Sequence, residues 1–164
     1  MKTCLVIYYS RTGITEKVAT RIAAQCACDI EPIRDMRSRR GLPGYLRCCH
    51  EALAKKTPPI APATANPGDY ELVILGAPIW VGRLSSPMRS YLQANAGRVP
   101  QVAAFCTMGG SGGDRALDEI AALCGKPLAA RMSLPDREIE SERGQEKIGR
   151  FIQEAAAAAD RPIA

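Results

Sequence analysis

The chain has 164 residues, of which 46% are hydrophobic, and a formal net charge of +5 at pH 7. This length suits one compact domain, residues 1–164, that needs no disulfide or metal to stabilise its core. No secretory apolar segment follows Met1, and no stretch approaches the roughly 20 apolar residues of a membrane span. We therefore expect a soluble, cytoplasmic protein, and the composition argues against a membrane span.

Strand-like and helical patterns alternate along the chain. Residues 3–9 are a continuous apolar run, as expected of a strand buried on both faces of a parallel sheet. A helical stripe over 13–26 and a second strand at 28–34 follow. The later elements are strands at 70–77, 102–106 and 128–134, and helices that begin near Ser85, cover about 115–124 and end the chain around 148–155. Five strands alternating with helices predict an α/β fold with both faces of a parallel sheet covered.

A basic insertion of about residues 34–66 separates the second strand from the third. Its first part, up to Lys56, holds seven basic residues against two acidic ones. The basic residues are Arg34, Arg37, Arg39, Arg40, Arg47, Lys55 and Lys56. Gly41–Gly44 is predicted to be a turn that leads into a short amphipathic helix, whose apolar stripe is Leu42, Leu46, Cys49 and Leu53. The proline-rich residues 57–62 are predicted to form an extended connector.

The seven cysteines are scattered and odd in number, and the chain has one histidine, His50. Without a CxxC pair or further imidazoles, we expect neither a zinc site nor another metal site. Most cysteines occupy apolar positions of predicted strands or helices, where a free thiol behaves as a small hydrophobic side chain. We therefore expect buried, inert thiols, with Cys48-Cys49-His50 as the one cluster that is a candidate for thiol reactivity.

A polar segment joins the first strand to the first helix. It reads Ser10-Arg11-Thr12-Gly13-Ile14-Thr15. The first N–H groups of a helix lack backbone partners and lie at the positive end of the helix dipole, so an anion binds well there. The three hydroxyls add donors, and Gly13 allows close approach of the backbone. The segment predicts a phosphate cradle, although a Ser/Thr helix cap explains it equally well; it contains neither a P-loop nor a dinucleotide fingerprint.

Two further loops leave the carboxyl ends of predicted strands. One is Pro78-Ile79-Trp80-Val81-Gly82, which carries the only tryptophan. The other begins Thr107-Met108-Gly109-Gly110-Ser111 and continues to Gly113. Ligands of open parallel sheets bind beyond the carboxyl ends of the strands, so we expect the three loops to converge at one edge. A cradle, an indole and a glycine-rich backbone together suit a planar ring that carries a phosphate.

In the order and spacing of these loops, the chain resembles the flavodoxin-like family. The resemblance rests on Ser10–Thr15, Ala77–Gly82 and Thr107–Ser111 and covers nearly the whole sequence. It implies a three-layer sandwich with a five-stranded parallel sheet in the order 2-1-3-4-5 and FMN as the cofactor. It further implies that the hydroxyls and backbone of 10–15 hold the FMN phosphate, with Arg11 at a variable position. Backbone groups of 78–82 and 107–111 would bond the polar edge of the flavin.

The same resemblance implies that Trp80 lies against the isoalloxazine ring or closes over its edge, in place of its other interpretation as a core aromatic. The chain departs from acidic long-chain flavodoxins by its positive charge. It also has Met108 and glycines where many of them carry a tyrosine, so one flavin face is expected to be open. The expected function is electron transfer through FMN, and the alternative is an FMN-dependent NAD(P)H:quinone-type oxidoreductase. No catalytic side chain is assigned, since the flavin supplies the chemistry.

The basic insertion is the feature of the sequence that indicates which kind of molecule exchanges electrons with this protein. It starts where the second strand ends, at the edge of the sheet that carries the three loops, so Arg37, Arg39, Arg40 and Tyr45 are expected to reach the site. The hypothesis is that they dock an acidic redox partner protein or a small carboxylate-bearing electron acceptor. The alternative is a solvated basic face. Nucleic acid is not expected as a partner, because the basic residues are confined to one segment and only Tyr45 lies among them as an aromatic.

Overall fold

A computed structural model describes residues 2–159 of the chain. Its strands are β1 (Lys2–Tyr8), β2 (Asp29–Pro32), β3 (Tyr70–Trp80), β4 (Arg83–Leu84), β5 (Gln101–Met108) and β6 (Arg131–Pro135). Its helices are α1 (Ile14–Cys26), α2 (Gly41–Leu53), α3 (Ser86–Asn95), α4 (Gly113–Cys124) and α5 (Glu142–Ala159), with short 3-10 turns at Pro67–Asp69, Ala96–Arg98 and Asp136–Glu138. The expected strands and helices are present, with ends shifted by a few residues.

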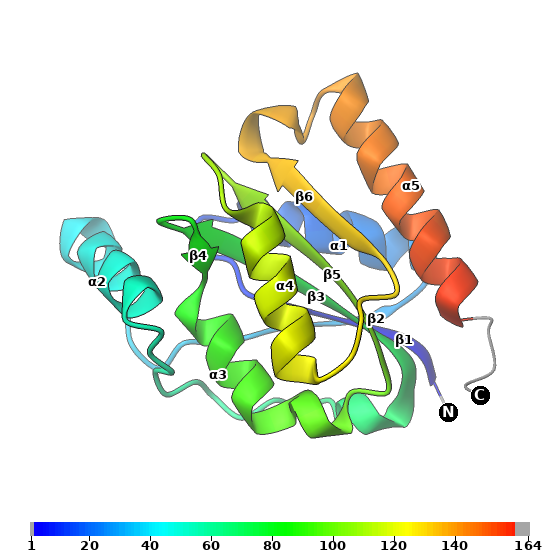
Figure 1. Cartoon of the computed structure of the whole chain (residues 1–164), viewed down its shortest axis with the longest axis horizontal. Coiled ribbons are helices and arrows are strands. Elements are labelled where there is room, and N and C mark those ends of the chain that lie inside the picture. Colours follow the sequence, from blue (N-terminus) through cyan, green and yellow to red (C-terminus); the bar gives the residue numbers. More distant parts are fainter. Residues whose placement is uncertain (1, 160–164) are drawn as a thin grey trace.

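The sheet is parallel in the order β2-β1-β3-β5-β6. Counted along the five parallel strands, this is the predicted order 2-1-3-4-5. In register, Val6 of β1 lies opposite Ile74 of β3, which lies opposite Ala103 of β5. Helices α1 and α5 cover one face and α3 and α4 the other (Figure 1). The predicted flavodoxin-like three-layer sandwich is therefore confirmed.

Each face of the sheet has its own core. Val18 and Ile22 of α1 pack with Phe151 of α5 on one face. On the other face, side chains of α3 and α4 pack against alternate residues of β3 and β5. Because both faces of the central strands are buried, these strands appear in the sequence as continuous apolar runs.

The segment 78–82 is a strand end and a turn, and the prediction of a loop there is wrong. β3 continues to Trp80, which pairs with Arg83 of the short antiparallel strand β4. The two turn residues, Val81 and Gly82, have φ angles of 52° and 68°, as a type I′ hairpin turn requires. A β-branched residue such as Val81 adopts this left-handed conformation at a cost of about 1–3 kcal/mol. Pairing of β3 with β4 therefore holds a strained backbone at the edge of the sheet.

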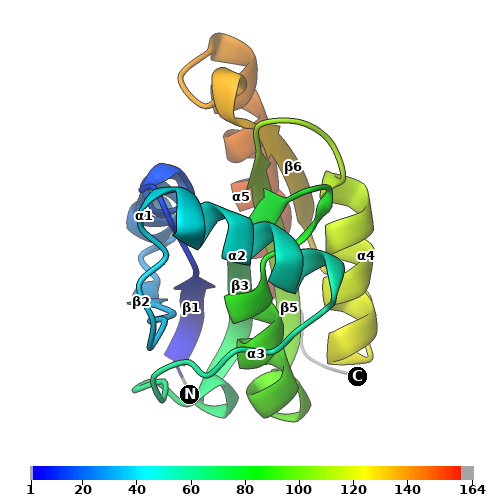
Figure 2. The same ribbon diagram turned by 90° about the vertical axis from the view of Figure 1, so that its left-hand side faces the viewer.

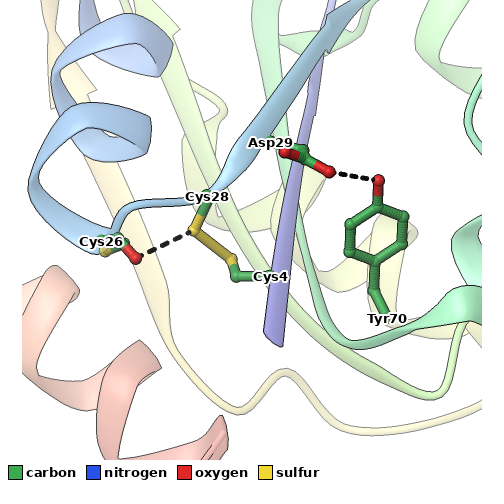
Figure 3. The surroundings of a disulfide bond; sticks show 5 residues. All are labelled: Cys4, Cys26, Cys28, Asp29 and Tyr70. Carbon is green, nitrogen blue, oxygen red and sulfur yellow. Dashed lines mark hydrogen bonds between the residues drawn. A yellow bond between two sulfur atoms is a disulfide. The ribbon is translucent and has the colours of Figure 1, made fainter. Parts of the chain in front are cut away.

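The expectation that the cysteines are free thiols is wrong for Cys4 and Cys28, which form a disulfide (Figure 3). Cys4 lies in β1, and Cys28 lies immediately before β2. In the parallel register of these strands Leu5 lies opposite Asp29, so the preceding residues are also neighbours. Ala27, with φ 50°, ends α1 and turns the chain back toward β1. Spacing along the sequence did not reveal this pair, because the strand register brings the two residues together.

We expect Cys28→Ser to lower the free energy of unfolding. The disulfide joins residues with a sequence separation of 24, and closing a loop of that size stabilises a fold by about 3 kcal/mol through the unfolded state. Denaturant unfolding of the variant and of the oxidised and reduced wild-type protein measures the loss. Cys26→Ser, which removes a free thiol two residues away, is the matched control. Equal stability of the oxidised and reduced wild-type protein would contradict a structural role for the bond.

Helix α2 presents its apolar stripe to solvent. An amphipathic helix ordinarily packs that stripe against a core, but the buried residues of α2 are Gly44, Cys48, Glu51 and Ala52. Leu42, Tyr45, Leu46 and Leu53 are instead 51–69% exposed. Figure 2 shows α2 on the outside of the molecule, in front of β3 and next to α3. The helix begins at Gly41, so Gly41–Gly44 forms its first turn, and the prediction of a separate turn there is wrong.

Candidate functional site

Residues from the three predicted segments line one cleft at the carboxyl end of the sheet. Its volume is about 140 Å³. The lining residues are Arg11, Thr12, Ile14, Thr15, Tyr45, Pro78, Ile79, Trp80, Thr107, Met108, Gly109 and Asp136. The segments converge because β1, β3 and β5 are parallel neighbours, so their carboxyl ends share an edge. Tyr45 of the basic insertion reaches the cleft, as the sequence predicted, and Asp136 is the lining residue that the sequence analysis missed.

The other predicted site residues belong to the same three segments but do not line this cleft. They are Ser10, Gly13, Val81, Gly82, Gly110 and Ser111. Gly82 and Gly112 bring two loops together, because a Cβ on Gly112 would lie 2.5 Å from the carbonyl oxygen of Gly82. Glycine at this position thus allows the β3–β4 turn to contact the loop after β5.

The amino end of α1 is open to a ligand. Gly13 is the N-cap residue, with φ 90°, and no described side chain caps the helix. The hydroxyl of Ser10 accepts a hydrogen bond from the N–H of Gly13 itself (3.0 Å), which shapes the turn. A Cβ placed on Gly13 would meet nothing within 4 Å. The helix-cap interpretation therefore fails, and without a side-chain cap the start of α1 has the arrangement in which a helix N-terminus can bind an anion.

Thr15 connects the cradle to β5. Its side chain is buried, and its hydroxyl lies 2.8 Å from that of Thr107. Either hydroxyl can be the donor of this hydrogen bond. This bond joins the start of α1 to the end of β5, and thus the first of the three segments to the third.

Trp80 is both a wall of the cleft and part of the packing beneath it. Its half-buried ring contacts the edge of Tyr9, with 5.6 Å between the centroids. The guanidinium of Arg39 lies 5.2 Å from the centre of the indole, a cation–π contact. Contacts with two neighbours hold the indole in position in the absence of a ligand.

Arg39 is an internal residue, and its predicted role in docking is wrong. It is 5% exposed, and it pairs with the carboxylates of Asp35 and Glu51, the latter at 2.6 Å. Burial alone would lower the pKa of Arg39, but the hydrogen bonds with Glu51 and Asp35 outweigh it and raise the pKa. Among the three predicted docking residues, Arg37 and Arg40 are exposed. The sequence analysis predicted that Arg39 is exposed because the number of basic residues in a segment does not reveal which of them pair with buried carboxylates.

Glu51 is the acidic residue at the centre of this buried network. Besides Arg39, it accepts hydrogen bonds from Arg47 at 2.9 Å and from the hydroxyl of Ser86 in α3 at 2.8 Å. Burial alone would raise the pKa of Glu51, but these donors outweigh it and lower the pKa. The network joins α2 to α3 and to the loop before α2.

Arg11 links the cradle to the basic insertion. Its Nε donates to the carbonyl oxygen of Arg39 at 3.2 Å. Its guanidinium also lies 5.7 Å from the centre of the Tyr45 ring. Through Arg11 the insertion reaches the cleft, where Tyr45 becomes part of the wall. The family resemblance implied only that Arg11 stands at a variable position of the phosphate-binding segment.

Asp136 brings an unpaired acceptor to the cleft. It follows β6, whose carboxyl end lies beside that of β5. Within residues 2–159, its buried Oδ1 atom has no hydrogen-bond partner, and burial raises the pKa of this carboxyl group. A hydroxyl or N–H donor on a ligand would satisfy the atom. The position of Asp136 at the end of the last strand was the sequence signal that could have identified it.

The members of the Cys48-Cys49-His50 cluster differ in burial. Cys48 is buried, and burial raises the pKa of its thiol although Arg39 lies 3.7 Å from the sulfur. Cys49 is half-buried and His50 is exposed. In the part of the chain that the structure describes, no three His, Cys, Asp or Glu side chains gather in a way that could hold a metal. Over the same residues, no helix is long and apolar enough to cross a bilayer.

The strand order, the helical layers and the position of the cleft define a flavodoxin-like fold. A flavoprotein from Lactobacillus acidophilus NCFM, solved in complex with FMN, matches with a TM-score of 0.69 and 19% identity over 85% of this chain and 97% of its own. A flavodoxin from the domain Archaea matches with a TM-score of 0.62 and 17% identity over 98% and 100% of the two chains.

A third solved structure, rubredoxin oxygen:oxidoreductase from the anaerobe Desulfovibrio gigas, contains a similar unit. It has a TM-score of 0.64 and 19% identity over 97% of this chain and 36% of its own. A scan against models of protein families found no match, and a search of curated proteins found none either. At these identities, the likeness to solved structures establishes the fold.

Proposed function

We propose that this protein binds FMN in the cleft and transfers electrons through it. The observation that carries the proposal is the uncapped amino end of α1, where Thr12, Ile14 and Thr15 line a cleft walled by Trp80 and residues 107–109. This combination suits a ligand with a phosphate at one end and a flat ring at the other. The L. acidophilus protein, which has the same fold, was solved with FMN.

The residues of the cleft fit the parts of FMN. The first N–H groups of α1, with the hydroxyls of Ser10 and Thr12, would hold the phosphate. The unpaired Oδ1 atom of Asp136 would accept a hydrogen bond from a hydroxyl of the ribityl chain. Trp80 would flank the ring. When bound, FMN supplies the redox chemistry, and the protein supplies orientation and local polarity.

A second candidate function is an FMN-dependent oxidoreductase acting on a small acceptor such as a quinone. The observation that favours it is the openness of the third segment: Met108 is half-buried, and Gly109 and Gly110 are exposed. No bulky side chain of residues 109–112 covers the cleft, so a second flat molecule has access. In the electron-transfer proposal, an acidic redox partner occupies this side instead, with the exposed Arg37 and Arg40 available to it.

Titration of the apoprotein with FMN and with riboflavin tests the cofactor proposal. We expect FMN to bind at least about tenfold more tightly, because hydrogen bonds to a charged group contribute about 1.5–3 kcal/mol each. Flavin fluorescence quenching measures both affinities. Equal affinities would contradict a phosphate cradle, and failure to take up either flavin would refute the proposed function.

Anaerobic addition of NADH or NADPH to the FMN-loaded protein separates the two candidate functions. Rapid bleaching of the flavin absorbance by either nucleotide favours the oxidoreductase. A yellow protein that neither nucleotide reduces, but that chemical reductants do reduce, favours the electron carrier.

A further inference from the structure

The side chains Leu42, Tyr45, Leu46 and Leu53 form the α2 face, the outward apolar stripe of that helix. Of the eight exposed large hydrophobic residues described in the structure, these four and Met36 lie in the basic insertion. Exposed apolar residues that occur singly are ordinary, but a contiguous group of them marks an interaction surface. The concentration of exposed apolar side chains on one helix therefore needs a physical explanation.

The fold itself holds the α2 face outward. The opposite side of the helix carries Glu51, whose pairing with Arg39, Arg47 and Ser86 is buried. Gly44 packs against the backbone of Arg39 so closely that a Cβ there would overlap it. If α2 were rotated so that its leucines pointed inward, the ion pairs of Glu51 would be exposed. A leucine side chain would also take the place of Gly44 and overlap the backbone of Arg39. The outward stripe is thus a stable feature of the structure.

A cationic hollow adjoins α2. It has a volume of about 530 Å³, and four basic residues line it: Arg37, Arg47, Lys55 and Lys56. The one acidic residue in its wall is Glu51, which is already paired within the buried network. Arg47 is itself paired with Glu51, so Arg37, Lys55 and Lys56 give the hollow its uncompensated positive charge next to an apolar surface.

Resting on the proposed function, we propose that the α2 face and the cationic hollow dock an acidic electron-transfer protein. The contact surface of this partner has an apolar centre that packs against the leucines of the α2 face. It also has a projecting group of carboxylates that pairs with the basic residues of the hollow. Tyr45 belongs both to the α2 face and to the cleft wall. A protein bound to α2 would therefore lie beside the mouth of the cleft. Electron exchange with a flavin bound in the cleft requires the partner to be this close.

Charge and redox chemistry select this occupant over two others. A second copy of the chain, packed α2 against α2, would bring the basic residues of two copies with a net charge of +5 each into proximity, and like charges disfavour such an interface. A lipid bilayer is itself neither an electron donor nor an acceptor, so it gives no role to the position of Tyr45, which belongs both to the α2 face and to the cleft wall.

The test uses two redox proteins of opposite charge as probes: an acidic plant-type [2Fe–2S] ferredoxin and basic cytochrome c. Isothermal titration calorimetry at low and high salt measures the binding of each probe to the apo and FMN-loaded protein. We expect the ferredoxin to bind more tightly, with an affinity that falls as salt rises. Leu46→Glu should weaken its binding at least about tenfold, and Lys55→Glu with Lys56→Glu should do the same. Leu123→Glu, at an exposed leucine of α4, is the matched control and should bind as the wild type does.

Leu46 does not line the cleft, so Leu46→Glu should leave the FMN affinity unchanged. Equal binding of the two probes, or ferredoxin binding that Leu46→Glu leaves intact, would overturn the docking proposal. A dimer of this protein in analytical ultracentrifugation that Leu46→Glu dissociates would also overturn it. Cosedimentation of the protein with phosphatidylglycerol vesicles that Leu46→Glu abolishes would do the same. Because docking is also measured on the apoprotein, failure of the docking proposal is distinguishable from failure to bind FMN.

Discussion

Replacement of Arg39 by methionine is expected to lower the free energy of unfolding by about 3–5 kcal/mol. The side chain of Arg39 is 2% exposed, and the carboxylates of Asp35 and Glu51 that it pairs with are 9% and 10% exposed. Methionine has a similar length but no charge, so both acidic groups lose a buried partner. Arg47 remains near them and offsets part of the loss. Urea unfolding, followed by circular dichroism, measures the effect.

Arg37→Met is the control for this experiment, because Arg37 is exposed and only two residues away. Its stability should stay within about 0.5 kcal/mol of the wild type. Adding Glu51→Gln to Arg39→Met should restore part of the loss, since it removes one of the buried charges left unpaired. A loss below about 1 kcal/mol for Arg39→Met would show that the ion pairs are solvated and contribute little, as surface pairs do.

The second large effect is expected for Gly112→Ala, which should weaken FMN binding at least about tenfold. Gly112 has φ 102°, a conformation that costs an L side chain about 1–3 kcal/mol. The added Cβ would also lie 2.5 Å from the carbonyl oxygen and 2.6 Å from the Cα of Gly82. The β3–β4 turn and the loop after β5 would then separate, and this movement displaces Trp80 from the wall of the cleft.

Gly110→Ala provides a matched control in the same loop. A Cβ on Gly110 would meet nothing within 4 Å, and its backbone does not require glycine. FMN titrations of both variants, with unfolding curves to confirm that each is folded, measure the effect. Equal FMN affinities for the two variants would mean that the contact between the loops does not shape the cofactor site.

Local patterns in the sequence were sufficient to predict the layers of the fold and the position of the cleft. Runs such as 70–77 are apolar without interruption because both faces of a central parallel strand are buried, and this property is visible residue by residue. The carboxyl ends of adjacent parallel strands share an edge, so the segments after β1, β3 and β5 had to converge. The open amino end of α1 follows in the same way from a strand that turns directly into a helix at Gly13.

Pairings between distant residues could not be read from those patterns. Cys4 meets Cys28 through strand register, and Asp136 reaches the cleft because β6 lies beside β5. A count of basic residues did not distinguish the buried Arg39 from the exposed Arg37, since only tertiary packing brings Glu51 against one of them.

The sequence by itself determined the sheet, its helical cover and the turn from β1 into α1 at 10–15, because burial and helix geometry act over a few neighbouring residues. The tertiary structure alone decided which way α2 faces. Its apolar stripe has the spacing of a core-facing helix, but the buried ion pairs of Glu51 and the close packing of Gly44 turn that stripe to solvent. A leucine in place of Gly44 on the inner side would overlap the backbone of Arg39, so this steric limit and the pairing of Glu51 together set the orientation of α2.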